Sequence, residues 1–204
     1  HYQYEFELPS PVRGQNTTGI FELDLRNIAN PQFTDHHVDF FMAGDLIRGE
    51  EGCELTNDNL RFIENITESQ IVISEAAATC WANQIARSDI GSIHMDTELS
   101  KLFWDYDFGF NSTSESVHFP FLERKLGPNK PLELDIAFRN FTVGFNFLET
   151  DIIMSYTVDV NLAVQPSEGI LLSDSFELIT RLNLATEDGY AYLTVIENKL
   201  SSEG

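Results

Sequence analysis

Residues 71–87 read IVISEAAATCWANQIAR and form the one long helix-like stretch in a chain that otherwise resembles strand. Ser74 is a suitable N-cap, and Glu75 follows it in the first turn, where negative charge suits the helix dipole. Apolar and mostly small side chains recur at helical spacing: Ala77, Ala78, Trp81, Ala82 and Ile85. Such a face favours a sheet packed around the helix. The space between helix and sheet is then either filled core or a ligand cavity.

The rest of the chain is dominated by residues that alternate between apolar and polar, which indicates strands with one wet face. Nine stretches have strand-like patterns, from which we expect about eight strands: residues 19–28, 38–48, 92–95, 99–110, 131–138, 141–147, 152–164, 175–185 and 190–200. A short helical turn is predicted at 119–126. Residues 1–16 are predicted to be irregular, because Pro9 and Pro11 interrupt any pattern. We therefore predict an α+β fold in a single domain, residues 1–204.

The charge of the chain is strongly acidic, with 12 Lys and Arg against 33 Asp and Glu and a net charge of −21. Nucleic acids and anionic membrane surfaces both require a basic face, so this balance argues against either partner. The simplest interpretation of the acidity is solubility. No apolar run reaches the roughly 18 residues that a membrane-spanning helix needs.

Two cysteines are present, Cys53 and Cys80. A disulfide between them would tie the segment after the second predicted strand to the middle of the helix. Closing that loop would contribute roughly 3 kcal/mol of stability. The alternative is a pair of buried free thiols.

Four sequons for N-glycosylation begin at Asn16, Asn65, Asn111 and Asn140. The chain starts with His1 rather than Met, and its number of cysteines is even. Together these features favour a glycoprotein that is secreted or resides in the lumen of the secretory pathway.

No motif in the sequence carries catalytic chemistry: a glycine-rich phosphate loop, a nucleophile elbow and a zinc signature are all missing. Residues 35–39, DHHVD, hold metal-ligand residue types, but only His37 and Asp39 would share a strand face, which is too few for a site. The acidic loop 50–52 lacks the spacing of an EF-hand. The aromatic residues between 104 and 110 suit a core. We therefore expect no enzyme activity, no metal and no cofactor other than a bound lipid.

The order of several segments is also informative. VDFFMAGDL (38–46) is followed by LRFIENITESQIVISEAAATCWANQIARSDIGSIHMD (60–96) and FPFLERKLGPNKPLELDIAF (119–138). FTVGFNFLETDIIMSYTVDVNLAV (141–164) and SFELITRLNLATEDGYAYLTVIENKL (175–200) come next. This series resembles the C-terminal half of the bactericidal/permeability-increasing protein and lipopolysaccharide-binding protein family, within the tubular lipid-binding superfamily. Pattern and order carry the similarity over residues 38–200.

The resemblance implies a strongly twisted antiparallel sheet wrapped around one long helix. An apolar pocket between them would hold the acyl chains of a phospholipid or similar lipid. Members that bind lipopolysaccharide depend on a basic tip, which a chain with a charge of −21 does not offer, so endotoxin binding is not carried over. The family module also continues with another long helix and a closing strand. We expect a companion chain, or the remainder of a longer polypeptide, to supply them.

The leading hypothesis is a lipid-binding module, in which each buried CH₂ of acyl chain supplies ~0.8 kcal/mol of affinity. The rival is a structural or adhesive extracellular glycoprotein that uses the same sheet as an assembly surface without lipid. The predicted lipid-binding residues lie on the helix and on two strands: Ile73, Ala77, Ala78, Trp81, Ile85, Val143, Phe145, Met154, Tyr156 and Val158. A register error of one residue would turn every inward strand residue outward.

Overall fold

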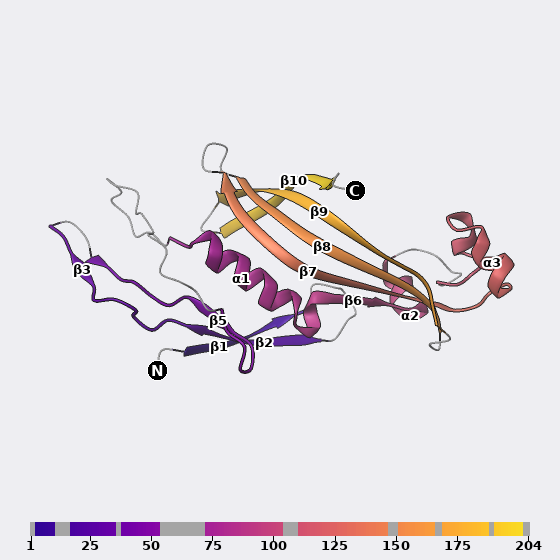
Figure 1. Cartoon of the computed structure of the whole chain (residues 1–204), viewed down its shortest axis with the longest axis horizontal. Helices are drawn as coiled ribbons and strands as arrows, with labels where there is room; N and C mark the ends of the chain where they lie inside the picture. The colour runs from indigo at the N-terminus through magenta and orange to yellow at the C-terminus, as the bar shows by residue number, and fades with distance from the viewer. Residues whose placement is uncertain are drawn as a thin grey trace.

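A computed structural model of the chain describes residues 3–10, 17–35, 38–53, 72–103, 110–146, 151–165, 169–187 and 190–201. Most of these residues belong to antiparallel sheets and to one helix, α1 (Glu75–Ala86). The larger sheet is long, twisted and curled, and α1 lies between it and a smaller sheet (Figure 1). Within these ranges, no helix is long and apolar enough to cross a membrane.

The larger sheet contains five strands in the order β10-β9-β8-β7-β6, and all neighbours pair antiparallel. Their bounds are β6 (Ser92–Met95), β7 (Leu132–Asn146), β8 (Asp151–Val164), β9 (Ile170–Glu187) and β10 (Tyr190–Leu200). The predictions at 92–95, 152–164 and 190–200 match β6, β8 and β10 within one residue. β9 is longer at its start than the predicted strand at 175–185. The prediction of a twisted, mostly antiparallel sheet is confirmed.

β7 is a single strand where the sequence predicts two. Asn140 has a φ of 56°, and the register with β8 shifts between Arg139 and Thr142. The apparent break in the pattern is therefore a β-bulge, in which Asn accepts a left-handed conformation that most residues avoid. The strand continues past the bulge, so both of its halves pair with β8 in the same sheet.

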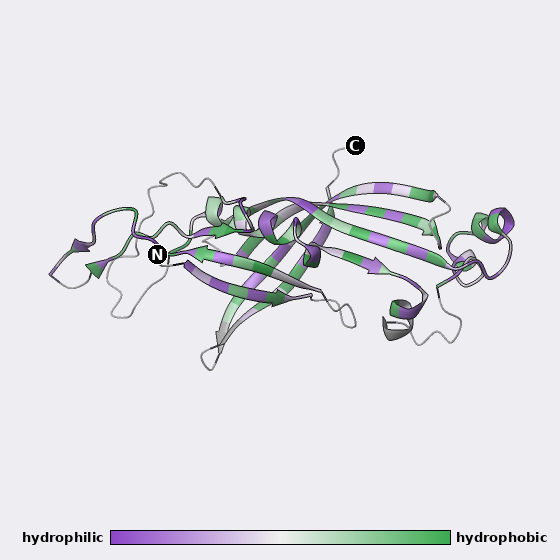
Figure 2. Ribbon diagram, turned by 90° about the horizontal axis from the view of Figure 1, so that it is seen from below, coloured by the Kyte–Doolittle hydropathy of each residue, from purple (hydrophilic) through white to green (hydrophobic). Residues whose placement is uncertain are grey.

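The register of the sheet gathers apolar side chains on one side, which we call the apolar face. Its members are Leu134, Ile136, Phe138, Val143 and Phe145 (β7), Ile152, Met154, Tyr156, Val158, Val160 and Leu162 (β8), Leu172, Phe176, Leu178, Leu182 and Leu184 (β9), and Leu193, Val195 and Leu200 (β10). The alternation is visible as bands along the strands in Figure 2. The opposite face carries ion pairs between Arg139 and Asp159 and between Arg181 and Asp151. The sheet thus has one apolar and one mainly polar side.

One end of the apolar face is covered by a compact cluster of buried residues: Phe110, Leu122, Leu132, Leu162 and Val164. Leu122 comes from α3 (Phe121–Leu126), which confirms the predicted helical turn. Gly127, with a φ of 85°, ends this helix in a conformation that favours glycine. A 3₁₀ turn, η2 (Glu115–Val117), precedes it.

The strand predicted at 99–110 is wrong at its start, because Thr97–Phe103 is a helix, α2. The carboxylate of Asp96 accepts the backbone N–H groups of Glu98 and Leu99 at 2.9 and 2.8 Å. This N-cap favours a helix over the strand that the two-residue alternation of the aromatic side chains predicts. The aromatic residues at 104–109 lie outside the described part of the chain.

The smaller sheet has the order β1-β2-β5, with β1 (Gln3–Pro9), β2 (Thr18–Asp24) and β5 (Asp45–Ile47). The prediction that residues 1–16 are irregular is therefore wrong over β1. Pro9 stands at the last position of that strand, opposite Thr18, where proline is tolerated. Phe6 and Leu8 of β1 pack against the core of this sheet.

Residues 38–48 do not form the single predicted strand. β4 (Val38–Asp39) pairs with β3 (Gln32–Phe33) in a narrow arm that projects from the body (Figure 1), and β5 begins only at Asp45. Gly44, with a φ of 62°, separates the two segments. The arm exposes four apolar side chains: Phe33, Val38, Phe40 and Met42. The pattern at 38–48, apolar on both faces, therefore does not correspond to a buried strand.

Candidate functional site: the apolar face and helix α1

Helix α1 confirms the prediction from residues 71–87. The hydroxyl of Ser74 accepts the N–H of Ala77 at 3.0 Å and caps the helix. The helix ends at Ala86 and leads into a 3₁₀ turn, η1 (Asp89–Gly91). A side chain at Gly91 would lie 2.0 Å from the carbonyl oxygen of Ala86, so only glycine fits there. Ser74 therefore sets the start of α1, and Gly91 lets the turn that follows pack closely against its last residue.

One stripe of α1 is polar, and it binds the backbone edge of β7. Glu75 accepts the N–H of Phe145 at 2.7 Å, and Thr79 accepts the N–H of Val143 at 2.8 Å. Asn83 accepts the N–H of Phe141 at 2.9 Å and donates to the carbonyl of the same residue at 2.7 Å. These are the backbone groups of β7 on the side away from β8, beyond the end of β6.

The match between helix and strand has a simple geometric origin. Four residues of helix rise about 6 Å, and two residues of strand advance about 6.6 Å. Side chains at positions 75, 79 and 83 therefore meet every second residue of β7, at 145, 143 and 141. This row of contacts, which we call the edge clasp, places α1 along the edge of the sheet. The expected wrapping of the sheet around the helix is not confirmed.

The opposite stripe of α1 packs on the smaller sheet. Cys80, Trp81 and Ile85 contact a buried cluster made of Phe21, Leu46, Cys53 and Ile90. The indole N–H of Trp81 donates to the carbonyl of Gly44 at 2.8 Å. The predicted disulfide joins Cys53 to Cys80, with the two Cα atoms 5.8 Å apart. Helix α1 is thus attached to both sheets.

The ten predicted lipid-binding residues fall into two groups. Val143, Phe145, Met154, Tyr156 and Val158 share the apolar face. Of the helix residues, Trp81 and Ile85 belong to the cluster on the smaller sheet, Ala77 is buried, Ala78 is half-buried and Ile73 is exposed. Contact with a lipid remains a prediction for all ten.

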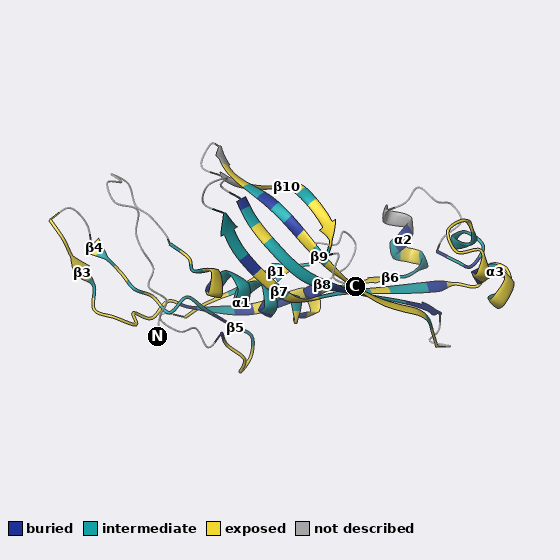
Figure 3. Ribbon diagram, turned by 45° about the horizontal axis from the view of Figure 1, so that its top comes forward, coloured by how far each residue is buried: buried dark blue, intermediate teal, exposed yellow. Residues whose placement is uncertain are grey.

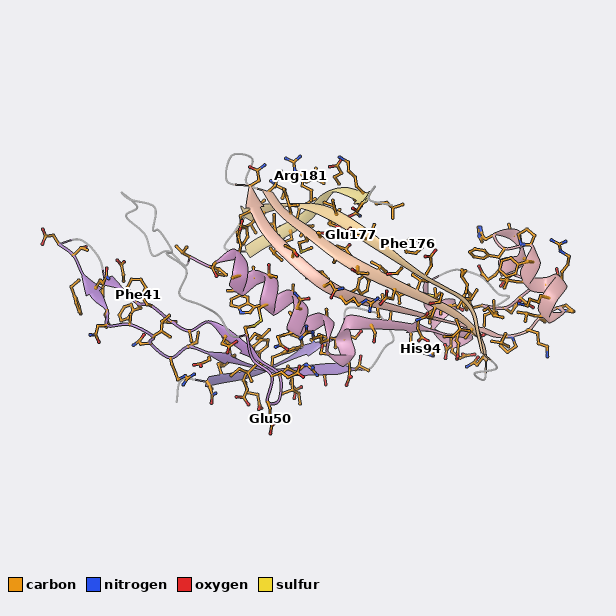
Figure 4. All side chains as sticks on the ribbon, in the orientation of Figure 1. Phe41, Glu50, His94, Phe176, Glu177 and Arg181 are labelled. Carbon is orange, nitrogen blue, oxygen red and sulfur yellow. A yellow bond between two sulfur atoms is a disulfide. The ribbon has the colours of Figure 1, made fainter. Side chains whose placement is uncertain are left out.

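The apolar face extends well beyond the predicted residues, onto β9 and β10. Phe176 is 38% exposed, Leu193 59% and Val195 55%. Figure 3 shows exposed residues along β10. Phe176 and Glu177 are neighbours on β9 that belong to opposite faces of the sheet (Figure 4). Sequence reasoning missed these residues, although the alternation of Leu172, Phe176, Leu178 and Leu182 was a visible signal.

Polar groups interrupt the apolar face at two places: Asp174 of β9 lies on it opposite Val160, and a row of polar side chains crosses it further along. Thr180, which is 4% exposed, donates its hydroxyl proton to the amide oxygen of Asn198 at 2.7 Å. Its oxygen therefore accepts from the hydroxyl of Tyr156 at 2.9 Å. The ring of Tyr156 stacks on Phe141 with centroids 4.9 Å apart. The row ends at the exposed amide N–H₂ of Asn198, which is a donor at the outer strand of the sheet.

Two ion pairs change the pKa values of their members. The hydrogen bonds from Arg26, at 2.7 and 2.9 Å, lower the pKa of Asp24, whose carboxylate is buried. The hydrogen bond between His94 and Asp135, at 2.6 Å, raises the pKa of His94. The negative charges of Asp135, Glu133 and Asp96 also raise the pKa of His94. Neither pair lies on the apolar face.

We expect the imidazole of His94 to titrate above its ordinary value of about 6.5 in an NMR pH titration. The charged ring is stabilised only in the folded state, so its stabilising effect is complete below that value and is lost as the pH rises through the folded pKa. Asp135→Asn should lower the pKa of His94. An unchanged pKa in that variant would contradict the role of the carboxylate.

Clusters suited to other chemistry are scarce. Among the described residues, no group of three or more His, Cys, Asp or Glu side chains is placed to hold a metal ion. His36 and His37 of the DHHVD segment lie outside the described ranges. Two of the sequon asparagines, Asn16 and Asn65, also lie outside them. The described residues thus leave the apolar face as the main candidate site.

Comparison with solved structures adds a distant likeness. A solved structure described as the crystal structure of lipopolysaccharide binding protein matches with a TM-score of 0.41 and 14% sequence identity. The match covers 88% of this chain and 41% of that chain, so this chain spans less than half the length of that protein. No protein-family model and no curated protein sequence matches. A likeness at this TM-score does not indicate what the chain binds.

Proposed function

We propose that this chain binds an amphipathic lipid whose acyl chains lie on the apolar face. The observation that carries the proposal is the exposure of large apolar side chains across β9 and β10, on the same side as the buried Val143 and Val158. Contiguous exposed apolar surface in a folded protein marks a site for a ligand, a membrane or a partner. The polar row from Tyr156 to Asn198 supplies a donor for an ester or head-group oxygen. The proposed site keeps the five predicted strand residues and leaves Trp81 and Ile85 in the core.

The proposal is tested by placing a charge on each face of the same strand. Phe176 is 38% exposed on the apolar face and Ile179 is 37% exposed on the opposite face. We expect Phe176→Asp to weaken binding of a fluorescent phosphatidylcholine at least roughly tenfold, because an acyl chain would then cover a carboxylate. Ile179→Asp, the matched control, should bind like the wild type. Equal effects of the two substitutions, or no lipid in organic extracts of the purified protein, would contradict the proposal.

We further propose that the chain resides in the secretory pathway, which the disulfide supports. Asn140 is exposed at the bulge of β7, whereas Asn111 is half-buried and its amide oxygen accepts the N–H groups of Thr113 and Ser114. In a secretory expression host we expect a glycan on Asn140 and none on Asn111. Peptide mapping after enzymatic deglycosylation in ¹⁸O-water measures both sites. A glycan on Asn111 in place of Asn140 would contradict this expectation.

A second candidate function, a structural or adhesive role, is favoured by β10. This strand is the last of the larger sheet, and its outer edge pairs with no other described strand. Such an edge accepts a strand from another chain, including the expected companion chain. Light scattering combined with size-exclusion chromatography tests this role, for which a discrete assembly without bound lipid is expected. We propose no catalytic role.

A further inference from the structure

The far end of the larger sheet carries a small lobe, residues 110–131, which we call the end lobe. It contains η2 and α3 and projects beyond the ends of β7, β8 and β9, away from α1 and the arm (Figure 1). Leu122 of α3 is fully buried in the cluster that covers this end of the apolar face. The end lobe is therefore joined to the proposed lipid site without being part of it.

The end lobe is held in one shape by buried polar contacts. The hydroxyl of Ser112, which is fully buried, donates to the carbonyl of Gly127 at 2.7 Å and accepts the backbone N–H of Lys130 at 2.9 Å. Prolines at 120, 128 and 131 fix φ on both sides of α3. A surface that is already ordered loses little conformational entropy when it binds a partner.

Part of the surface of the end lobe is apolar. Val117 is 80% exposed, Phe119 38% and Phe121 41%. The two phenylalanine rings lie edge to face, with their centroids 6.2 Å apart. Large apolar side chains that are exposed together mark a surface for a membrane, a ligand or a partner.

The exposed charges of the end lobe are all positive. Arg124, Lys125 and Lys130 are exposed, and no ion pair among the described residues involves them. The two acidic residues of the lobe, Glu115 and Glu123, are half-buried. The end lobe thus has a net charge of +1 in a chain whose net charge is −21.

We propose that the end lobe docks the protein on a phospholipid bilayer that contains anionic lipids. Its rings enter the boundary between head groups and acyl chains, and its cations attract the anionic head groups. Salt limits the reach of a charge to about 8 Å, whereas β8 alone extends roughly 45 Å, so acidic residues farther along the sheet add little repulsion. Net charge alone argued against such a membrane because it averages over the whole chain.

This inference deepens the proposed function, because it names the surface from which the lipid is taken. Docking itself does not require a lipid on the apolar face. Phe176→Asp, which should weaken lipid binding, is therefore expected to dock on vesicles like the wild type. Failure of the lipid proposal and failure of the docking proposal can thus be told apart.

The test is flotation of the protein with vesicles of phosphatidylcholine that contain phosphatidylserine. We expect binding that weakens as salt rises and that is at least roughly tenfold weaker on pure phosphatidylcholine. Phe119→Ser/Phe121→Ser should weaken binding at least roughly tenfold, because the rings no longer bury apolar surface in the bilayer. Phe33→Ser, at a position of the arm that is 78% exposed, is the matched control and should bind like the wild type.

The charges are tested separately. Lys125→Glu should also weaken binding to the mixed vesicles at least roughly tenfold. Lys199→Glu makes the same change of charge at an exposed site on β10 and should bind like the wild type. Loss of docking in Phe176→Asp would place the contact on the apolar face and would overturn the proposal.

Other results would overturn it as well. These are equal binding to the two kinds of vesicle, or equal losses in Phe33→Ser and Phe119→Ser/Phe121→Ser. A loss in Lys125→Glu without a loss in the double variant would indicate a site for any polyanion. A dimer that Lys125→Glu dissociates, with no binding to vesicles, would show that the lobe contacts a second copy of the chain. If the double variant does not fold, Val117→Ser takes its place.

Discussion

Removing the Thr79 and Asn83 contacts of the edge clasp should destabilise the protein by about 3–5 kcal/mol. In the double variant Thr79→Val/Asn83→Leu, the side chains keep their approximate volumes but lose the acceptors for the N–H groups of Val143 and Phe141. A buried N–H left without a partner costs about 1–3 kcal/mol, and the carbonyl of Phe141 loses its donor as well. Urea denaturation measures the free energy of unfolding, and amide hydrogen exchange shows which groups open.

The edge clasp predicts a local effect on hydrogen exchange, which a general loss of stability would not produce. Exchange of the Val143 and Phe141 amides should accelerate more than exchange in β8 and β9. Thr194→Val, an exposed position on β10 of the same sheet, is the matched control and should change stability by no more than about 0.5 kcal/mol. If the double variant loses less than about 1 kcal/mol, or if the two amides stay protected, the clasp does not stabilise the edge of β7.

Breaking the Cys53–Cys80 disulfide should cost about 3 kcal/mol, because the unfolded chain gains the freedom of a loop. The bond closes 27 positions and joins α1 to the turn after β5, within the core of the smaller sheet. The paired substitution Cys53→Ala/Cys80→Ala should therefore lower the urea midpoint. Packing of α1 against β1, β2 and β5 should loosen more than the larger sheet, as measured by hydrogen exchange.

Substitution also removes two sulfur atoms from a packed region, so wild-type protein reduced in denaturant is the necessary comparison. Reduction removes the cross-link and keeps the thiols, and it should reproduce most of the loss of stability. A single Cys80→Ala variant should behave like the reduced protein. Unchanged stability of the reduced protein would show that the loop is restrained without the bond.

Several elements were predictable because short-range patterns determine them. The Ser74 cap, the four-residue spacing within α1 and the alternation along β8 and β10 are all local signals. The helix α2 carried its own local signal in Asp96, but the aromatic alternation that follows suggested a strand. In β1, Pro9 ends the strand and does not prevent it. These errors come from weighing two local rules against each other.

The candidate site was less predictable because it depends on pairings between distant residues. Nothing near Thr79 indicates that its hydroxyl meets Val143, 64 positions away. The sequence showed the apolar stripe of α1 clearly, but did not show that this stripe faces the smaller sheet and that the polar stripe meets the larger one. The face shared by the strand residues was easier to predict. The two-residue period of a strand places Met154, Tyr156 and Val158 on one face once any of them is placed.

The edge clasp also has a consequence for how the chain is made. A nascent polypeptide leaves the ribosome from its N-terminus, and domains begin to fold during synthesis. Helix α1 precedes β7 in the chain, so its polar stripe is already available when the open edge of β7 emerges. An unpaired strand edge is a template for aggregation with other chains. The order of the two elements along the sequence therefore shortens the time for which that edge is unprotected, and variants without the clasp should give more insoluble product during expression.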